Sequence, residues 1–406
     1  MLVTKIDAVA DRWKTARSGP SWRIGPTGAL EEVDENALRH DWDPVTLAYR
    51  GVRVEAPATQ LVEYARAEGY VVGAIGSGGQ MPTGWTANSP ASILGGGVLA
   101  GWPYIDVRWQ SAGSISTITL VYLPTTPAVP GDVVTYGLHA QLLAGSLANV
   151  TLQNSVQFRT SGNANISFAQ AAFVPTGADF RGQFFSDVQT APATTANMVG
   201  RLRLFSTGAT DFTLRISLPQ MWKSALRYSP AFSDPGAHGQ VLRNADDIAD
   251  GNAAFWMGEQ GTFVVDFMPG QTAGDATRGI ISMDDGTAQN RVDLYLAQAN
   301  LGTFLTALSG GVTQVAALSI GTATALARNT LRFSWGPAGY FASLNGAAAV
   351  SAALGVAPAG LSRVWLGKRG GALSAYLNGW LGPRVACFPY EYTSTPAPDG
   401  FTIRDR

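Results

Sequence analysis

Carboxylates that could cleave a glycosidic bond are the first chemistry to look for in this chain. Cleavage needs two of them facing one bond, about 5–9.5 Å apart. The most acidic cluster lies near the N-terminus and comprises Glu31, Glu32, Asp34 and Glu35. It falls partly in a turn with no aromatic cleft around it, and the only glutamates beyond residue 230, Glu259 and Glu391, have no Glu neighbour. We therefore predict a solvated acidic surface, no catalytic residues and no enzyme activity.

Aromatic and amide side chains suit a second chemistry, the binding of sugars. A flat aromatic ring can cover the C–H face of a sugar, and amides or carboxylates can bind its hydroxyl groups. The candidate residues are Trp85, Trp102, Tyr104, Trp109, Tyr376 and Asn378. Trp102-Pro103-Tyr104 has the more loop-like sequence, so it is the better exposed candidate. The alternative is that these are ordinary core aromatics, which is the more common role.

Hard oxygen ligands suitable for Ca²⁺ occur together at Asp284, Asp285, Asn290 and Asp293. However, Asp285-Gly286 is also a typical hairpin turn, and we favour the turn. The three histidines, His40, His139 and His238, are too scattered for a zinc site. The single cysteine, Cys387, lies in an apolar run typical of a buried thiol. No cofactor motif is present, and we predict no metal and no cofactor.

The composition is that of a polar β-protein. Only 14% of the 406 residues are charged, and residues 1–68 hold 9 Lys/Arg and 11 Asp/Glu of them. The net charge of −1 provides no basic surface for nucleic acid. No apolar run reaches the ~18 residues of a membrane span, and the N-terminus does not resemble a signal peptide. Lys and Glu are depleted in strands, and such a composition favours an all-β fold.

One amphipathic helix is predicted over residues 4–17. Ile6, Val9 and Trp13 fall on a single apolar stripe with helical spacing. The stripe either packs on the protein's own body or serves as a docking and oligomerising surface. For the docking role, we expect removal of residues 1–21 to spare folding and to block assembly.

Turn and strand signals divide the chain into three parts. Residues 1–68 contain the helix and a β-meander of short strands, which we call the N-terminal meander. Its charges occupy alternate or turn positions typical of a solvated face. Residues 69–229 and 230–406 each contain many strand-like runs separated by Gly, Pro and Ser, without helical periodicity. This pattern predicts two tandem jelly-roll β-sandwiches after the N-terminal helix and meander.

The order of short motifs resembles a family of structural proteins from tailed bacteriophages and related particles. The motifs of the N-terminal meander are Gly28 to Leu30, Asn36 to Arg39, Asp41 to Pro44 and Gly51 to Glu55. The family's usual Arg-Thr-Asn-Leu is replaced by Ala58-Thr59-Gln60-Leu61. The middle part resembles a carbohydrate-binding-module-like jelly roll. The C-terminal part resembles a concanavalin A-like (laminin-G-like) sandwich, with Gly261 to Phe267, Asp285 to Thr287, Phe341 to Gly346 and Tyr376 to Gly379 as its motifs.

This resemblance implies a fibre or spike component on the surface of a virion or phage-like particle, synthesised in the bacterial cytoplasm. Its partners would be other particle proteins, reached through residues 1–68, and a polysaccharide on the host cell surface, bound as an adhesin binds it. It would be a homo-oligomer that neither binds nucleic acid nor inserts into a membrane. Two alternatives are a particle-borne polysaccharide depolymerase or glycoside hydrolase and a purely architectural decoration protein.

Overall fold

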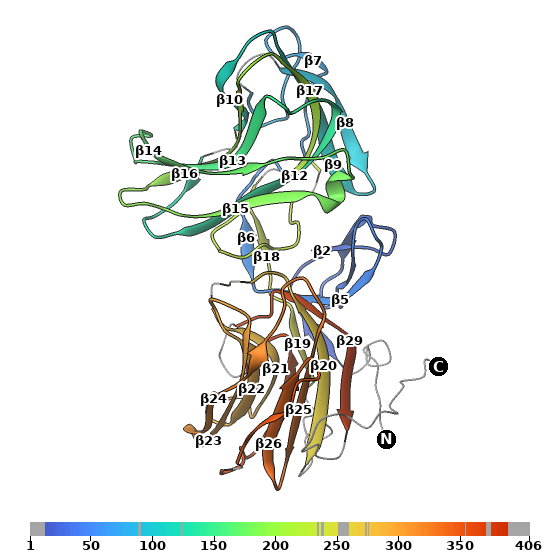
Figure 1. Ribbon diagram of the computed structural model, residues 1–406, viewed down its shortest axis with the longest axis vertical. Coiled ribbons are helices and arrows are strands. Elements are labelled where there is room, and N and C mark those ends of the chain that lie inside the picture. The colour runs from blue at the N-terminus through green and yellow to red at the C-terminus, as the bar shows by residue number, and fades with distance from the viewer. Residues whose placement is uncertain are drawn as a thin grey trace.

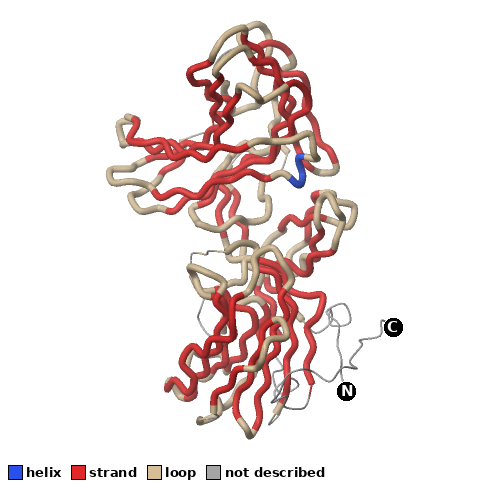
Figure 2. Tube along the Cα trace, viewed as in Figure 1, coloured by secondary structure: helices blue, strands red, loops and turns tan. Residues whose placement is uncertain are grey.

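The chain folds into two β-sandwiches that lie end to end along the long axis of the molecule (Figure 1). The computed structural model describes residues 13–87, 91–122, 125–233, 235–236, 239–250, 260–272, 274, 276–353, 355–370 and 375–388. Within them, strands dominate, and one short 3-10 helix, η2 (Phe180–Gly182), is present (Figure 2). None of the helical structure described is long and apolar enough to cross a membrane. The prediction of an all-β protein with two tandem sandwiches is confirmed.

The middle sandwich packs a six-stranded sheet against a sheet with four main strands. The first has the order β15-β12-β17-β9-β8-β7, and the second has the order β10-β16-β13-β14, with β11 also paired to β16. The strands are β7 (Gly73–Ala74), β8 (Ala91–Leu99), β9 (Trp102–Ser111), β10 (Ile115–Tyr122), β11 (Thr126–Pro127), β12 (Val133–Gly145), β13 (Val150–Arg159), β14 (Asn165–Phe173), β15 (Phe184–Thr190), β16 (Asn197–Ser206) and β17 (Thr210–Trp222).

The C-terminal sandwich consists of two seven-stranded sheets, and both take strands from the N-terminal meander. Their orders are β1-β19-β28-β21-β22-β23-β24 and β27-β26-β25-β20-β29-β5-β4. The strands beyond the meander are β19 (Asp247–Asp250), β20 (Gly261–Pro269), β21 (Arg278–Asp284), β22 (Arg291–Leu296), β23 (Gly302–Ser309), β24 (Val312–Thr322), β25 (Asn329–Gly336), β26 (Gly339–Leu344), β27 (Val350–Ala352), β28 (Arg363–Leu366) and β29 (Gly379–Phe388).

The N-terminal meander connects the two sandwiches. Its strands are β1 (Lys14–Ala16), β2 (Ser21–Ile24), β3 (Leu30–Val33), β4 (His40–Trp42), β5 (Tyr49–Val54) and β6 (Ala58–Gln60). β2 and β3 pair with each other, and β6 pairs with β18 (Val241–Arg243) from the segment between the sandwiches. Leu30 is buried in the core of the middle sandwich, whereas Val52 and Val54 are buried in that of the C-terminal sandwich. The meander lies between the two sandwiches (Figure 1) and contributes to both hydrophobic cores.

The helix predicted over residues 4–17 is not formed in its described part. Residues 14–16 are a strand, β1, in which Thr15 pairs with Ile248 of β19. Trp13 is only 3% exposed and belongs to the core of the C-terminal sandwich, so it is not a docking residue. Ile6 and Val9 lie outside the described residues. Pairing with a distant strand and burial of an indole outweigh the weak local preference for helix.

Candidate functional site

Three of the aromatic residues predicted to bind sugar are instead buried in the middle sandwich. Trp85, Trp102 and Trp109 are 4%, 1% and 1% exposed. Trp109 points into the core and stacks on Phe212 with ring centroids 5.5 Å apart. Trp85 donates its indole N–H to the carbonyl of Tyr64 at 2.9 Å. These rings cannot cover a sugar. They are core aromatics, which was the alternative interpretation of the sequence.

Trp102 begins strand β9, so the prediction of a loop at Trp102-Pro103-Tyr104 was wrong, and the N-terminal meander covers its ring. Its indole N–H donates to the carbonyl of Gly28 at 3.2 Å, and its ring makes edge contacts with His139 and Phe180. Phe180 belongs to η2, which packs over the six-stranded sheet at this point. The prediction that Trp102 is exposed was wrong because the residues that cover it come from the β2–β3 turn and η2, both distant in sequence.

His139 belongs to this aromatic cluster, and its titration makes a testable contribution to stability. Burial lowers the pKa of its imidazole to about 4, with a further contribution from the positive charge of Arg227. Protonation therefore favours the unfolded chain, so the stabilisation is complete above about pH 6.5 and is lost as the pH falls towards 4.

Between pH 7 and pH 5, we expect the free energy of unfolding of the wild type to fall by about 2 kcal/mol more than that of His139→Gln. Gln retains an N–H that can donate to the Phe180 carbonyl, as the imidazole Nδ1 does at 3.0 Å. Urea unfolding at several pH values measures the difference. Parallel pH profiles for the two proteins would show that His139 does not titrate in this range.

Tyr104 is the one candidate that keeps an accessible ring, on the outer face of the six-stranded sheet. In β9, Ile105 and Val107 point inward and are fully buried, whereas the side chains of Tyr104, Asp106 and Arg108 alternate outward and are half-buried. The guanidinium of Arg215 lies 3.8 Å from the centroid of the Tyr104 ring.

Two arginine–aspartate pairs continue this surface along β9 and β17. Arg215 binds both oxygens of Asp106 at 2.8 and 2.9 Å, and Arg108 binds both oxygens of Asp211 at 2.7 and 2.6 Å. These hydrogen bonds lower the pKa of Asp211 and raise that of Arg215. We call this surface the Tyr104 platform. Its members are Tyr104, Asp106, Arg108, Asp211 and Arg215.

The neighbouring strand leaves space beside the ring of Tyr104. β8 carries three consecutive glycines, and Gly97 is the strand partner of Tyr104. A Cβ at Gly97 would lie 3.7 Å from the Tyr104 hydroxyl, and a Cβ at Gly95 would meet no atom within 4 Å. The platform therefore combines one aromatic ring, neighbouring glycines without side chains and fixed polar groups. Such an arrangement suits the binding of a polar ring.

Tyr376 and Asn378 do not form a second sugar-binding surface. They are 5% and 4% exposed. The Tyr376 hydroxyl donates to Asp247 at 2.8 Å, and Asn378 Oδ1 accepts the backbone N–H of Ala56 at 2.9 Å. Both side chains thus attach neighbouring segments to the C-terminal sandwich and have a structural role.

The proposed Ca²⁺ ligands are bound to protein donors. Asp284 accepts hydrogen bonds from Arg363 and Trp365, and Asp293 from Ser282, Arg291 and Arg369. Asp285, in the loop between β21 and β22, accepts hydrogen bonds from Asn290 and Thr287. Nowhere in the described part of the chain do three or more His, Cys, Asp or Glu side chains form a metal-binding group. The geometry is that of a polar hairpin turn, with Gly286 at a positive φ of 95°.

The N-terminal acidic cluster has ordinary surface contacts. Glu31 forms an ion pair with Arg23 at 3.0 Å, and its side chain is 34% exposed. Glu35 accepts the backbone N–H of Gly19. Glu259 and Glu391 lie outside the described residues. The contacts of Glu31 and Glu35 agree with the prediction of a solvated surface for this cluster.

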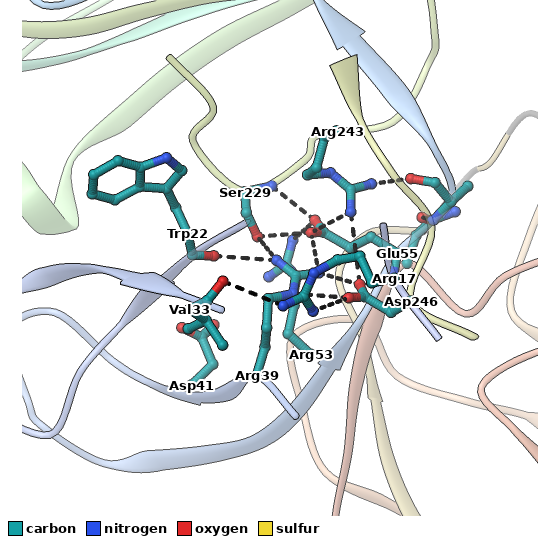
Figure 3. A network of polar contacts seen from close by, with 12 residues as sticks. Arg17, Trp22, Val33, Arg39, Asp41, Arg53, Glu55, Ser229, Arg243 and Asp246 are labelled. Carbon is teal, nitrogen blue, oxygen red and sulfur yellow. Dashed lines mark hydrogen bonds and ion pairs between the residues drawn. The ribbon is translucent and has the colours of Figure 1, made fainter. Parts of the chain in front are cut away.

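Other charges of the N-terminal meander form a buried network that the sequence did not indicate (Figure 3). Arg39, Glu55 and Asp246 are at most 1% exposed, and Arg39 bridges the two carboxylates. Arg17 also binds Asp246, at 2.9 Å, and Arg243 approaches Glu55 at 3.5 Å. The expectation that all charges of the meander are solvated was wrong, because Asp246 approaches from a segment about 200 residues away. We call these five residues the junction network.

The junction network is held together by electrostatic attraction between charges that are buried from solvent. Burial alone would raise the pKa of the Glu55 carboxyl, but Arg53, Arg243 and Arg39 hold it well below its usual value. Ser229 adds two hydrogen bonds to Glu55, from its backbone N–H at 2.8 Å and its hydroxyl at 2.7 Å. The network thus joins the N-terminal meander to the segment between the sandwiches, and its role is structural.

No protein-family model and no curated protein matches the chain. Among solved structures, the chain is similar to the CBM40 domain of a Ruminococcus gnavus sialidase bound to α2,6-sialyllactose. The two are 20% identical, the match covers 35% of this chain and 82% of that one, and the TM-score is 0.29. Mouse laminin α1 domains LG4-5 are similar at 11% identity over 75% and 96% of the two chains, with a TM-score of 0.28. A CBM22 tandem from Paenibacillus barcinonensis Xyn10C is similar at 12% identity over 80% and 99%, with a TM-score of 0.26. TM-scores this low establish neither a shared fold nor a shared ligand.

Proposed function

We propose that this protein binds a glycan through the Tyr104 platform. The half-buried Tyr104 ring on the outer sheet face, beside neighbouring glycines and two fixed arginine–aspartate pairs, carries this proposal. An aromatic ring suits the C–H face of a sugar, and the paired guanidinium and carboxylate groups suit its hydroxyl groups. Because the pairs already hold their side chains in place, little side-chain entropy is lost on binding.

Binding without cleavage is the mode of action we propose. Each carboxylate of the platform accepts two hydrogen bonds from an arginine, and for Asp211 those from Arg108 lower the pKa and favour the ionised form. A general acid needs a raised pKa, and burial or a second carboxylate nearby would be required to raise it. The pairing therefore supports recognition over hydrolysis.

The setting we propose is the surface of a bacteriophage or phage-like particle, where the protein is a fibre or spike component and acts as an adhesin. The order of motifs in the N-terminal meander supports this setting, and so does the meander's position between two sandwiches, which gives an elongated molecule (Figure 1). A homo-oligomer that binds host polysaccharide would gain avidity from several platforms acting together.

The test is a pull-down with host capsular or cell-wall polysaccharide, followed by sizing of the polymer. We expect the wild type to retain the polymer at its original length and Tyr104→Ala to bind about tenfold more weakly or worse, since losing a central aromatic contact costs at least about 1–2 kcal/mol. New reducing ends that increase with time would refute binding without cleavage and favour a depolymerase.

Tyr295→Ala is the matched control. Tyr295 is also half-buried and lies 4.1 Å from a guanidinium, that of Arg369, but it belongs to the C-terminal sandwich. We expect this variant to bind as the wild type does. If Tyr295→Ala loses binding and Tyr104→Ala retains it, the binding site is not the Tyr104 platform. Absence of binding to any host polysaccharide would favour an architectural role.

A further inference from the structure

The other sheet of the middle sandwich has an outer face with an unusual charge composition. Its four main strands, β10, β16, β13 and β14, contain three arginines and no aspartate or glutamate. The whole protein has a net charge of −1, so this sheet is a local concentration of positive charge. The sheet itself supplies no carboxylate to neutralise these arginines.

Strand register brings the polar side chains onto one surface. On β16, Arg201 and Arg203 alternate with the buried Leu202 and Leu204, so they point away from the core. Across β13, Arg201 pairs with Ser155, and Ser155 in turn pairs with Gln170 of β14. We call this surface the arginine face. Its members are Gln153, Ser155, Gln157, Arg159, Phe168, Gln170, Arg201, Arg203 and Phe205.

An exposed aromatic ring from the last strand of the sheet, β14, contacts both β16 arginines of the arginine face. Phe168 is 42% exposed, and the guanidinium carbons of Arg201 and Arg203 lie 4.5 and 5.0 Å from its centroid. Arg203 also lies 4.8 Å from the centroid of Phe205 and donates to the side-chain oxygen of Gln170. These contacts hold two cations side by side, next to an apolar ring and an amide.

Several polar atoms of this surface are buried without an internal partner. The hydroxyl of Ser155, which is 0% exposed, the side-chain oxygen of Gln153 and Nε of Arg203 form no hydrogen bond with the described residues. Burial also lowers the pKa of Arg203. Because these atoms are buried, a ligand on this surface reaches only the exposed Phe168 and Gln170 and the half-buried Arg203.

We propose that the arginine face binds a carboxylate-bearing polysaccharide. Arginine pairs with carboxylates through two parallel hydrogen bonds. The Phe168 ring can cover the C–H face of the same sugar, and the exposed amide of Gln170 can bind one of its hydroxyl groups. A bare anion would use the cations but neither the ring nor the amides. This site lies on a different sheet from the Tyr104 platform and does not depend on it.

Affinity electrophoresis of the full chain in gels containing polygalacturonate tests the proposal. We expect polygalacturonate to retard the wild type, and the retardation to weaken as salt is added. Neutral dextran and fully methyl-esterified polygalacturonate, which keeps the sugar backbone without its charge, should not retard it. Equal retardation by the esterified polymer, or by polyphosphate at the same charge concentration, would overturn the assignment to a carboxylated sugar.

Arg203→Gln should weaken binding to polygalacturonate about tenfold or more, because it removes a charge-assisted contact. Arg328→Gln, which removes an exposed arginine of the C-terminal sandwich, is the matched control and should bind normally. Thermal melting confirms that both variants are folded. Undiminished binding by Arg203→Gln, or loss of polygalacturonate binding in Tyr104→Ala alone, would overturn the proposal. The comparison of esterified with unesterified polymer uses only wild-type protein and remains decisive if a variant fails to fold.

Discussion

Replacing Asp246 by alanine is expected to lower the free energy of unfolding by about 3–5 kcal/mol, the usual cost of removing one partner from a buried ion pair. The Asp246 carboxylate binds both Arg17 and Arg39 and accepts the backbone N–H of Glu55 at 3.1 Å. Without it, buried positive charges remain with Glu55 as their main counter-charge. Urea unfolding followed by tryptophan fluorescence measures the change.

Glu31→Ala is the matched control for Asp246→Ala. It removes a carboxylate from the same part of the molecule, but the Glu31–Arg23 pair is partly exposed. Solvent screens such a pair, so the expected cost is below about 1 kcal/mol. If Asp246→Ala is no more destabilised than Glu31→Ala, the junction network does not hold the N-terminal meander in place.

Removing residues 1–21 is expected to destabilise the protein, contrary to the expectation from the sequence. The deletion removes Trp13 from the C-terminal core, where it lies with Val52, Ile248 and Leu366, and it removes the ion pair of Arg17 with Asp246. Loss of a buried tryptophan alone costs about 3–5 kcal/mol. Urea midpoints and resistance to a protease at increasing urea concentration measure the effect.

A shorter truncation, which lacks only residues 1–12 and begins at Trp13, separates an effect on stability from an effect on assembly. It retains β1, Trp13 and Arg17, so we expect it to unfold at nearly the same urea concentration as the full chain. Trp13→Ala in the full chain should reproduce most of the loss seen on removing residues 1–21. If both truncations and Trp13→Ala unfold at the same urea concentration as the full chain, the N-terminal strand does not contribute to the fold. A requirement for residues 1–12 in particle assembly stays a prediction.

Local sequence patterns predicted the class of fold and several of its turns. Alternation of apolar and polar residues from Gly51 to Glu55 reflects a two-residue repeat that any half-buried strand shows, and Val52 and Val54 of β5 are buried as this repeat requires. Asp285-Gly286 similarly predicts a turn, because Gly tolerates the positive φ that the turn requires. Both features depend on neighbouring residues alone and could be predicted from the sequence.

Long-range packing decided which aromatic residues remain accessible. Trp102 and Tyr104 are two residues apart and share a face of β9, so their local sequence treats them alike. Trp102 is covered because Gly28 and Phe180, 74 and 78 residues away, reach it. Phe180 also contacts Tyr104, with ring centroids 6.3 Å apart, but Tyr104 stays half-buried. No local pattern carries this information.

The sequence by itself determined that the chain is all-β, that it forms two sandwiches and that its charges concentrate near the N-terminus. The tertiary structure alone decided that the N-terminal meander belongs to both sandwiches and that Arg39 and Glu55 are buried. Strand periodicity and turn preference act over a few residues. Burial of a charge depends on a counter-charge such as Asp246, 207 residues from Arg39, and only the folded chain brings the two together.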